Sequence, residues 1–222
     1  NAADFGDLTV ARNAGGSSNS TRAVYWSNTS GSNVIDYVQM ASTGNATDFG
    51  DSTDARYGGG LAESPTRSVY GGGGTPGVTN IIDYITIATT GNATDFGDIN
   101  TATKGGMGGC SNSTRGVFGA GYTPTNLSQL EYVEIASTGN SIDYGDLSAA
   151  KQFVGANASS NRGIFGGGGT PSSINVIEYF AIPIGGTVAD FGDLTAVWSQ
   201  IAVGSNTHGG LNDGNQGVVD TT

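Results

Sequence analysis

One acidic phrase recurs five times along this chain of 222 residues and limits the folds open to it. The phrase reads Asp-Phe-Gly-Asp, with tyrosine in the fourth copy, and occupies residues 4–7, 48–51, 95–98, 143–146 and 190–193. The repeats that carry it start at residues 1, 45, 92, 140 and 187, in steps of 44, 47, 48 and 47 residues. A period in the forties with strand-like content is typical of a β-propeller.

Each repeat contains four short stretches with the character of β-strands. The third is the clearest, because it is β-branched and aromatic on both faces, as expected for a strand between two neighbouring sheets. It recurs at residues 33–38, 81–85, 130–133 and 176–180. A second strand precedes it at residues 21–25, 68–70, 116–118 and 163–165; a glycine-rich first strand comes earlier, as at residues 105–111, and the acidic phrase forms the fourth. The sequence predicts an all-β, five-bladed propeller of four-stranded blades in a single domain, residues 1–222.

The two ends of the chain predict how this propeller closes. The first acidic phrase follows no complete repeat, and the last repeat has no fourth strand after residues 201–204, 208–211 and 216–220. We expect the N-terminal residues 4–10 to supply that fourth strand, which would close the ring and remove the open sheet edges. Glycine in the innermost strands would let the five blades approach one another at the axis.

The charged residues also follow the repeat. The eight lysines and arginines form one column at Arg12, Arg56, Lys104 and Lys151 and a second at Arg22, Arg67, Arg115 and Arg162, with His208 in its fifth place. Of the nineteen acids, ten belong to the acidic phrases and five lie on third strands: Asp36, Asp83, Glu131, Glu178 and Asp220. The acids outside these positions are Asp54, Glu63, Glu134 and Asp213.

The second basic column and the third-strand acids flank one hairpin. Arg67 and Asp83 are 16 residues apart, and Arg22 and Asp36 are 14 apart. Even separations can place two residues opposite each other on one face. The sequence therefore predicts four structural ion pairs between blades: Arg22–Asp36, Arg67–Asp83, Arg115–Glu131 and Arg162–Glu178. The second aspartate of each acidic phrase lies five or six residues before the first column, and we expect it to pair there.

Charge and motif content argue against several classes of function. The net charge of −11 argues against nucleic-acid binding, which uses clustered lysine and arginine. No apolar run is long enough to cross a bilayer, so we expect no membrane insertion. No Ser-His-Asp set, zinc spacing or carboxylate dyad stands out, so we expect neither an enzyme nor a cofactor. We also expect no metal site, since Ca²⁺ needs six to eight oxygens and four of the five acidic phrases have a cation nearby; whether an ion binds there stays open.

Residues that depart from the repeat are the candidates for function. Trp26 stands where other blades have glycine, and Trp198 stands where they have arginine or lysine. Their faces suit sugar rings, so we expect a ligand site on one loop face formed by Trp26, Trp198, Asn28, Thr29 and Ser30, with hydrogen bonds from the last three. The alternative is that both tryptophans pack at the seam between the fifth and first blades. Threonine-proline loops form a second candidate site, which includes Tyr122.

Two resemblances bear on the identity of the repeats. A glycine run ends the second strand, residues 34–37 read Val-Ile-Asp-Tyr, and Ala11-Arg12 stands in the place of a Pro-x-x-Arg segment. These features resemble kelch repeats, with phenylalanine or tyrosine where kelch has tryptophan. The wording of residues 81–87 and 111–118 more closely resembles repeats of marine tailed-phage virion proteins, cyanophage ones especially, and this resemblance covers nearly the whole chain. It implies a virion or tail-fibre context and an extracellular location on the virion surface.

These observations together predict a non-enzymatic adhesion module. Its partner would be a host-surface polysaccharide or another virion protein, bound by apolar stacking and hydrogen bonds. The alternative is a purely structural or decoration protein of the capsid or tail, and an enzyme acting on polysaccharide is a third interpretation. The host, the ligand, the oligomeric state and the length of any surrounding fibre are left open by the sequence.

Overall fold

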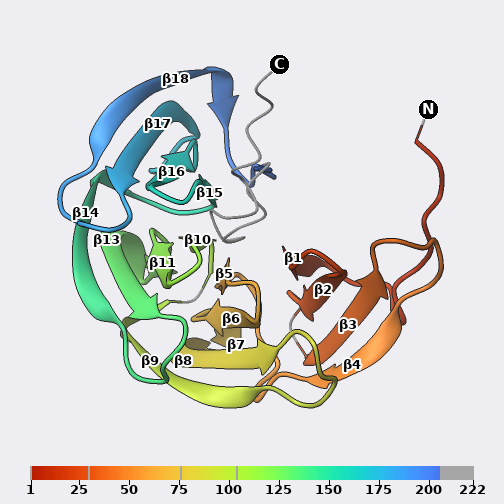
Figure 1. Ribbon diagram of the computed structural model, residues 1–222. Coiled ribbons are helices and arrows are strands. Elements are labelled where there is room, and N and C mark those ends of the chain that lie inside the picture. The colour runs from red at the N-terminus through yellow and green to blue at the C-terminus, as the bar shows by residue number, and fades with distance from the viewer. Residues whose placement is uncertain (1, 30, 76, 104, 206–222) are drawn as a thin grey trace, which may run out of the picture.

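Four antiparallel sheets are arranged around a common axis, each forming one blade of a β-propeller (Figure 1). The computed structural model describes residues 2–29, 31–75, 77–103 and 105–205. In each blade the four main strands run in chain order from the innermost to the outermost. This architecture confirms the all-β propeller part of the predicted fold class.

The strand bounds are as follows. Blade 1 consists of β1 (Ala14–Ser18), β2 (Arg22–Ser27), β3 (Val34–Gln39) and β4 (Thr47–Asp51). Blade 2 consists of β5 (Gly60–Glu63), β6 (Arg67–Gly71), β8 (Gly77–Thr86) and β9 (Thr94–Thr103), with the short β7 (Gly74–Thr75) beside β8. Blade 3 consists of β10 (Gly108–Ser111), β11 (Arg115–Gly119), β13 (Thr125–Glu134) and β14 (Ile142–Lys151), with β12 (Tyr122–Thr123) beside β13. Blade 4 consists of β15 (Gly155–Ala158), β16 (Arg162–Gly166), β17 (Ile174–Ala181) and β18 (Ala189–Trp198).

Each blade has a β-bulge at the acidic residue of its third strand. The register between third and fourth strands shifts at Ile35/Asp36, Ile82/Asp83, Leu130/Glu131 and Ile177/Glu178. A bulge bends its strand and changes the direction of nearby side chains. It accompanies the same acid in all four blades, and these four acids are buried.

The hydrophobic core lies in the seams between successive blades. The seam of blades 1 and 2 contains Val24, Trp26, Ile35, Phe49 and Tyr70, among others. Two further clusters fill the seams of blades 2 and 3 and of blades 3 and 4. Blades 2 and 3 are apolar on both faces, so burying these faces requires a neighbouring blade on each side.

The structure differs from the prediction of five blades closed by the N-terminal strand. The described residues form four blades, and residues 2–10 form no strand because no third strand among the described residues pairs with them. Residues 208–211 and 216–220, which include Asp220 and follow the expected start of a fifth blade, lie outside the described residues. Residues 201–205 do lie beside β15, where the hydroxyl of Ser205 donates to the carbonyl of Ala158 at 3.0 Å.

The first four acidic phrases each hold the following blade through a contact that we call the clasp. In the clasp of blades 1 and 2, the carbonyls of Phe49 and Asp51 accept the N–H groups of Gly91 and Ala93, at 2.7 and 2.8 Å. The N–H of Asp51 donates to the side chain of Asn92 at 3.1 Å. Residues 96–98 hold residues 139–141 in the same way, and residues 5–7 hold residues 44–46. In the clasp of blades 3 and 4, Thr187 stands in place of the asparagine.

The glycine of the acidic phrase makes the clasp possible. Gly97 has φ of +144°, and a Cβ atom there would lie 2.4 Å from the carbonyl oxygen of Gly139. Gly192, in the last acidic phrase, has φ of +135° but no atom within 4 Å of an added Cβ. Phe191 beside it is 52% exposed, whereas Phe49 of a filled clasp is 3% exposed. Among the described residues, the last clasp is therefore open.

These two glycines allow the close approach to be measured separately from backbone strain. Both Gly97→Ala and Gly192→Ala place a Cβ atom at a positive φ, but only Gly97→Ala meets the backbone of the next blade. We expect Gly97→Ala to lower the free energy of unfolding by about 1–3 kcal/mol more than Gly192→Ala does. Urea denaturation of the two variants measures this difference, and equal losses would contradict the clasp.

Candidate functional site

The two tryptophans predicted to share an exposed loop face lie in different surroundings. Trp26 is 1% exposed, its indole N–H donates to the Ser68 hydroxyl at 2.9 Å, and its ring lies 5.5 Å from that of Tyr70. Trp198, at the end of β18, is 59% exposed. The expected pair of stacking faces is therefore wrong, because Trp26 is buried by blade 2. The alternative seam between a fifth and a first blade is also wrong for Trp26, which lies between blades 1 and 2.

Three of the third-strand acids, Asp36, Asp83 and Glu178, pair with the first basic column and not with the second. A guanidinium nitrogen of Arg12 lies 2.7 Å from Asp36, Arg56 lies 3.0 Å from Asp83, and Lys151 pairs with Glu178. Lys104, the remaining member of the column, lies outside the described residues. The predicted pairs Arg22–Asp36, Arg67–Asp83, Arg115–Glu131 and Arg162–Glu178 are wrong, as is the pairing of Arg12, Arg56 and Lys151 with the acidic phrases.

Strand register explains this error. Arg67 lies opposite Thr86 in the β6–β8 ladder, while Asp83 lies opposite Tyr70. The two residues are thus three positions apart along the hairpin and point to different faces. An even separation in sequence is compatible with pairing, but the length of the turn decides whether pairing occurs.

The second basic column joins successive blades in another way. The guanidinium groups of Arg22, Arg67, Arg115 and Arg162 lie 4.5–4.8 Å from the ring centres of Tyr37, Tyr84, Tyr132 and Tyr179. Arg22 also donates to the carbonyl of Ile87 at 2.8 Å, and Arg67 donates to that of Ile135 at 2.9 Å, each in the following blade. Cation–π contact and these hydrogen bonds together hold Arg22 and Arg67 at their seams.

The third-strand acids hold the connections that enter their blades. Asp83 accepts hydrogen bonds from the N–H and hydroxyl of Thr53, at 3.1 and 2.6 Å, and Asp36 does the same with Thr9. Glu131 accepts the N–H groups of Asn100 and Thr101, at 2.8 and 3.1 Å. These acids are engaged in holding the architecture.

A cavity of about 440 Å³ lies where the chain turns into the innermost strands, and we call it the axial mouth. It is lined by Asn13, Asn28, Tyr57, Gly58, Gly59, Gly106, Met107, Phe153, Val154 and Gln200. Hydrogen bonds link the turns around it: Met107 N–H to Gly58, Phe153 N–H to Gly106, and Gln200 N–H to Phe153, at 3.1, 2.7 and 2.9 Å. The mouth is thus built from equivalent turns of successive repeats.

Two of those turns depart from the repeat. Gly58 and Gly106 have φ of +74° and +71°, and Phe153 and Gln200 hold the equivalent positions at φ of +58°. A residue other than glycine in this conformation costs roughly 1–3 kcal/mol and marks a candidate functional site. Both side chains border the mouth, and Phe153 is exposed. Sequence reasoning missed them, although each lies two residues after a first-column position, Lys151 or Trp198.

The lining of the mouth combines aromatic and amide groups and contains no charged side chain. Tyr57 and Phe153 supply rings, and Asn13, Asn28 and Gln200 supply amides. Of the predicted ligand residues, Asn28 does line the mouth, and its side chain accepts the N–H of Gly58. Thr29 lies next to it and accepts the N–H of Asn13 at 3.1 Å, whereas Tyr122 lies in β12, outside the lining. Ser30 lies outside the described residues, and the structure does not bring the rest of the predicted set together.

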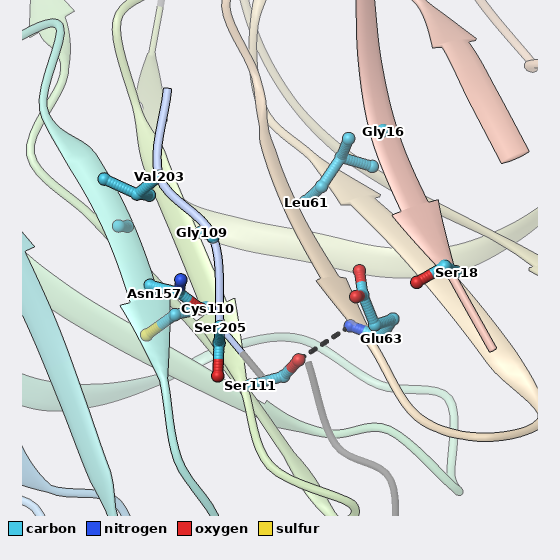
Figure 2. A pocket seen from close by; sticks show the side chains of 12 residues that line it. Gly16, Ser18, Leu61, Glu63, Gly109, Cys110, Ser111, Asn157, Val203 and Ser205 are labelled. Carbon is cyan, nitrogen blue, oxygen red and sulfur yellow. Dashed lines mark hydrogen bonds between the residues drawn. The ribbon is translucent and has the colours of Figure 1, made fainter. Parts of the chain in front are cut away.

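A second cavity of about 270 Å³ lies farther along the innermost strands, and we call it the axial cavity (Figure 2). Its walls come from β1, β5, β10, β15 and residues 203–205. The carboxyl of Glu63 lies in this cavity, and burial raises its pKa to about 8, although the N–H of Ser18 acts in the opposite direction. Burial also raises the pKa of the Cys110 thiol to about 12, so that this cysteine is neutral and unsuited to act as a nucleophile.

Breaking a buried ion pair from one side should be costly. Asp83→Asn leaves the guanidinium of Arg56 buried without its counter-charge, so we expect the free energy of unfolding to fall by about 3–5 kcal/mol. Asp95→Asn, at an exposed acid of the same blade, is the control and should stay within about 0.5 kcal/mol of the parent. Chemical denaturation tests both, and a small effect of Asp83→Asn would show that the pair contributes little.

Two glutamates should give opposite pH dependences. Glu63 has a pKa raised from 4.5 to about 8, so the folded protein holds this proton more tightly and stability falls as pH rises between these values. Burial also raises the pKa of Glu178, but hydrogen bonds from Lys151 and Ser148 outweigh it and hold this pKa below 4.5. The contribution of Glu178 is complete above pH 4.5 and is lost as pH falls through its lower folded pKa.

Thermal melts across this pH range test both signs. Glu63→Gln should remove the loss of stability that the parent shows as pH rises toward about 8. Glu178→Gln should make the loss of stability at acid pH less steep than in the parent. A Glu63→Gln curve that runs parallel to the parent between pH 4.5 and about 8 would contradict the assignment.

Comparison with known proteins leaves the family open. No family model matches the sequence, and no curated protein matches it. Within residues 2–29, 31–75, 77–103 and 105–205, no helix is long and apolar enough to cross a membrane. In the same part of the chain, no three His, Cys, Asp or Glu side chains gather where they could share a metal ion.

Proposed function

We propose that this protein is a non-enzymatic propeller module that binds an uncharged carbohydrate at the axial mouth. The observation that carries the proposal is the lining of the mouth, where two aromatic rings and three side-chain amides meet without any charged group. Ligand sites generally combine apolar walls with a few placed polar groups, and amphipathic aromatic rings suit the faces of sugars. The amides supply the donors and acceptors that hydroxyl groups require.

The strained turns support the same proposal. Phe153 and Gln200 adopt a backbone conformation for which two other repeats use glycine, at Gly58 and Gly106. Both side chains border the mouth. A chain that needed only the turn would be more stable with glycine there. Retention of two larger side chains therefore favours a role in binding over a role in folding.

The net charge of the protein favours a neutral ligand. The chain carries −11, so that an acidic polysaccharide would be repelled at long range. Together with the resemblance of the repeats to those of tailed-phage virion proteins, this favours adhesion to a neutral host-surface glycan from the surface of a virion or tail fibre. Another virion protein with exposed amides and aromatic groups is the alternative partner.

A closed, five-bladed ring is part of this proposal. Residues 201–205 lie along β15, as β15 lies along β10, which supports a further blade at this position. The open clasp at residues 190–193 lacks the Asn-Ala pair that fills the clasps of blades 1 and 2, and Asn1-Ala2 carries that pair at the N-terminal side of the first acidic phrase. With residues 4–10 as its outermost strand, the fifth blade would fill the gap between β18 and the N-terminal segment in Figure 1.

A purely structural role is the second candidate, and one observation favours it. All of the first-column and second-column cations that the structure describes lie against acids, rings or carbonyl groups of the protein itself. Such a protein would decorate the particle and bind no glycan.

Binding to a panel of purified bacterial surface polysaccharides tests the function. Phe153→Gly restores the residue that two other repeats use at this turn, so the variant should fold at least as well as the parent. We expect it to bind the selected polysaccharide about two- to twelvefold more weakly, since a stacked ring contributes roughly 0.5–1.5 kcal/mol. Tyr122→Ser, at an exposed aromatic residue outside the mouth, is the control and should bind as the parent does.

The other outcomes separate the alternatives. If neither the parent nor the variants bind any polysaccharide, the structural role replaces adhesion. If Tyr122→Ser loses binding and Phe153→Gly keeps it, the site lies in the threonine-proline loops. Release of shorter sugars from the polysaccharide would contradict the non-enzymatic proposal.

A further inference from the structure

Glu63 departs from the repeat at a position that faces the axial cavity. It lies opposite Ser68 in the β5–β6 ladder, and the equivalent positions of the other blades are Ser18, Ser111 and Ala158. The innermost strands thus present small side chains here, except for one carboxylate. Glu63 is also one of the few acids that belong neither to an acidic phrase nor to a third strand.

This carboxylate has no counter-charge within the described residues. The buried acids Asp36, Asp83 and Glu178 each pair with an arginine or a lysine. No arginine or lysine lines the axial cavity, and no described cation pairs with Glu63. Within the described residues this carboxylate therefore lacks a counter-charge, and a buried charge of this kind is costly unless the group holds a proton or binds a cation.

The cavity around Glu63 offers further oxygen atoms. In Figure 2 the hydroxyl of Ser18 points toward the carboxylate, and the hydroxyl of Ser111 accepts the N–H of Glu63 at 2.9 Å. Asn157 and Ser205 line the same space from β15 and the segment after β18. A volume of about 270 Å³ is larger than a single water molecule requires, so that an ion can enter with part of its hydration shell.

We propose that the axial cavity is a binding site for a small cation, held by the carboxylate of Glu63 and by neutral oxygen atoms of the innermost strands. The ligand is a positively charged group that is either coordinated by oxygen atoms or donates hydrogen bonds to them. A hydrated metal ion and a primary ammonium group both fit this description. The site is separate from the axial mouth, so that it stands independently of carbohydrate binding.

Cation binding at this site is coupled to release of a proton. Burial keeps Glu63 protonated near neutral pH, with a pKa of about 8, and a bound cation requires the carboxylate. The only other titratable group in the lining is Cys110 on β10, whose thiol has a pKa raised to about 12 and stays neutral. β1, β15 and residues 203–205 contribute no titratable side chain to the lining.

Melting temperature and proton release on the full chain test the proposal together. The probes are the chlorides of Na⁺, K⁺, Ca²⁺ and methylammonium at pH 7, with ionic strength held constant by tetramethylammonium chloride. We expect at least one probe to raise the melting temperature saturably and to release about one proton per chain, as measured by calorimetry in two buffers. A response to Na⁺, K⁺ or Ca²⁺ identifies a metal ion as the occupant, and a response to methylammonium alone identifies an ammonium group.

Two variants assign the effect to Glu63. Glu63→Gln keeps the shape of the side chain, and Glu63→Ser installs the residue of the equivalent positions in β1 and β10. Both should fold and should lose the saturable stabilisation and the proton release. An effect that persists in these variants, or a parent protein that responds to none of the four probes, would overturn the proposal. A carboxylate already ionised at pH 7 in the cation-free protein would also overturn it, because the chain would then supply the counter-charge itself.

Discussion

Backbone contact at one glycine sets how closely successive blades approach each other. At each filled clasp the glycine of the acidic phrase lies against the main chain of the next blade, where a Cβ atom would come within 2.3–2.7 Å of a carbonyl oxygen or carbon. The hydrogen bonds on either side of that glycine form because the two chains are this close. The seams that bury the aromatic core, and the arginines that cross those seams, depend on the same spacing. The acidic phrase therefore recurs along the sequence because it packs each blade against the next.

The described basic groups and the third-strand acids of the four blades are used in holding the propeller together, so the candidates for function are the residues that depart from the repeat. The cations of both columns that the structure describes have partners within the protein, and the third-strand acids of the four blades hold the connections into their blades. Glu63, Phe153 and Gln200 break the repeat instead, and all three lie at cavities along the axis. Comparison of equivalent positions in successive repeats therefore identifies a few residues that could not be singled out from one blade alone.

The repeat period and strand pattern are sufficient to predict a propeller, because strands that are apolar on both faces require neighbouring sheets on both sides. The partners of the charged columns are not predictable in the same way, since they depend on a register that places Arg67 opposite Thr86. The burial of Trp26 depends on Tyr70 of the next blade, which no local pattern reveals. Phe153 was within reach of the sequence, because aligning the repeats on the first basic column places it with Gly58 and Gly106.

The clasp has a consequence for how a protein of this kind arises. The donor surface and the acceptor surface lie on opposite sides of every blade, and each joint uses nearly the same atoms as the joint before it. Duplication of one repeat within the gene therefore adds a blade that already fits both of its neighbours, without any new interface having to evolve. Selection can then act on single turns and single innermost residues, while the joints between the copies stay interchangeable.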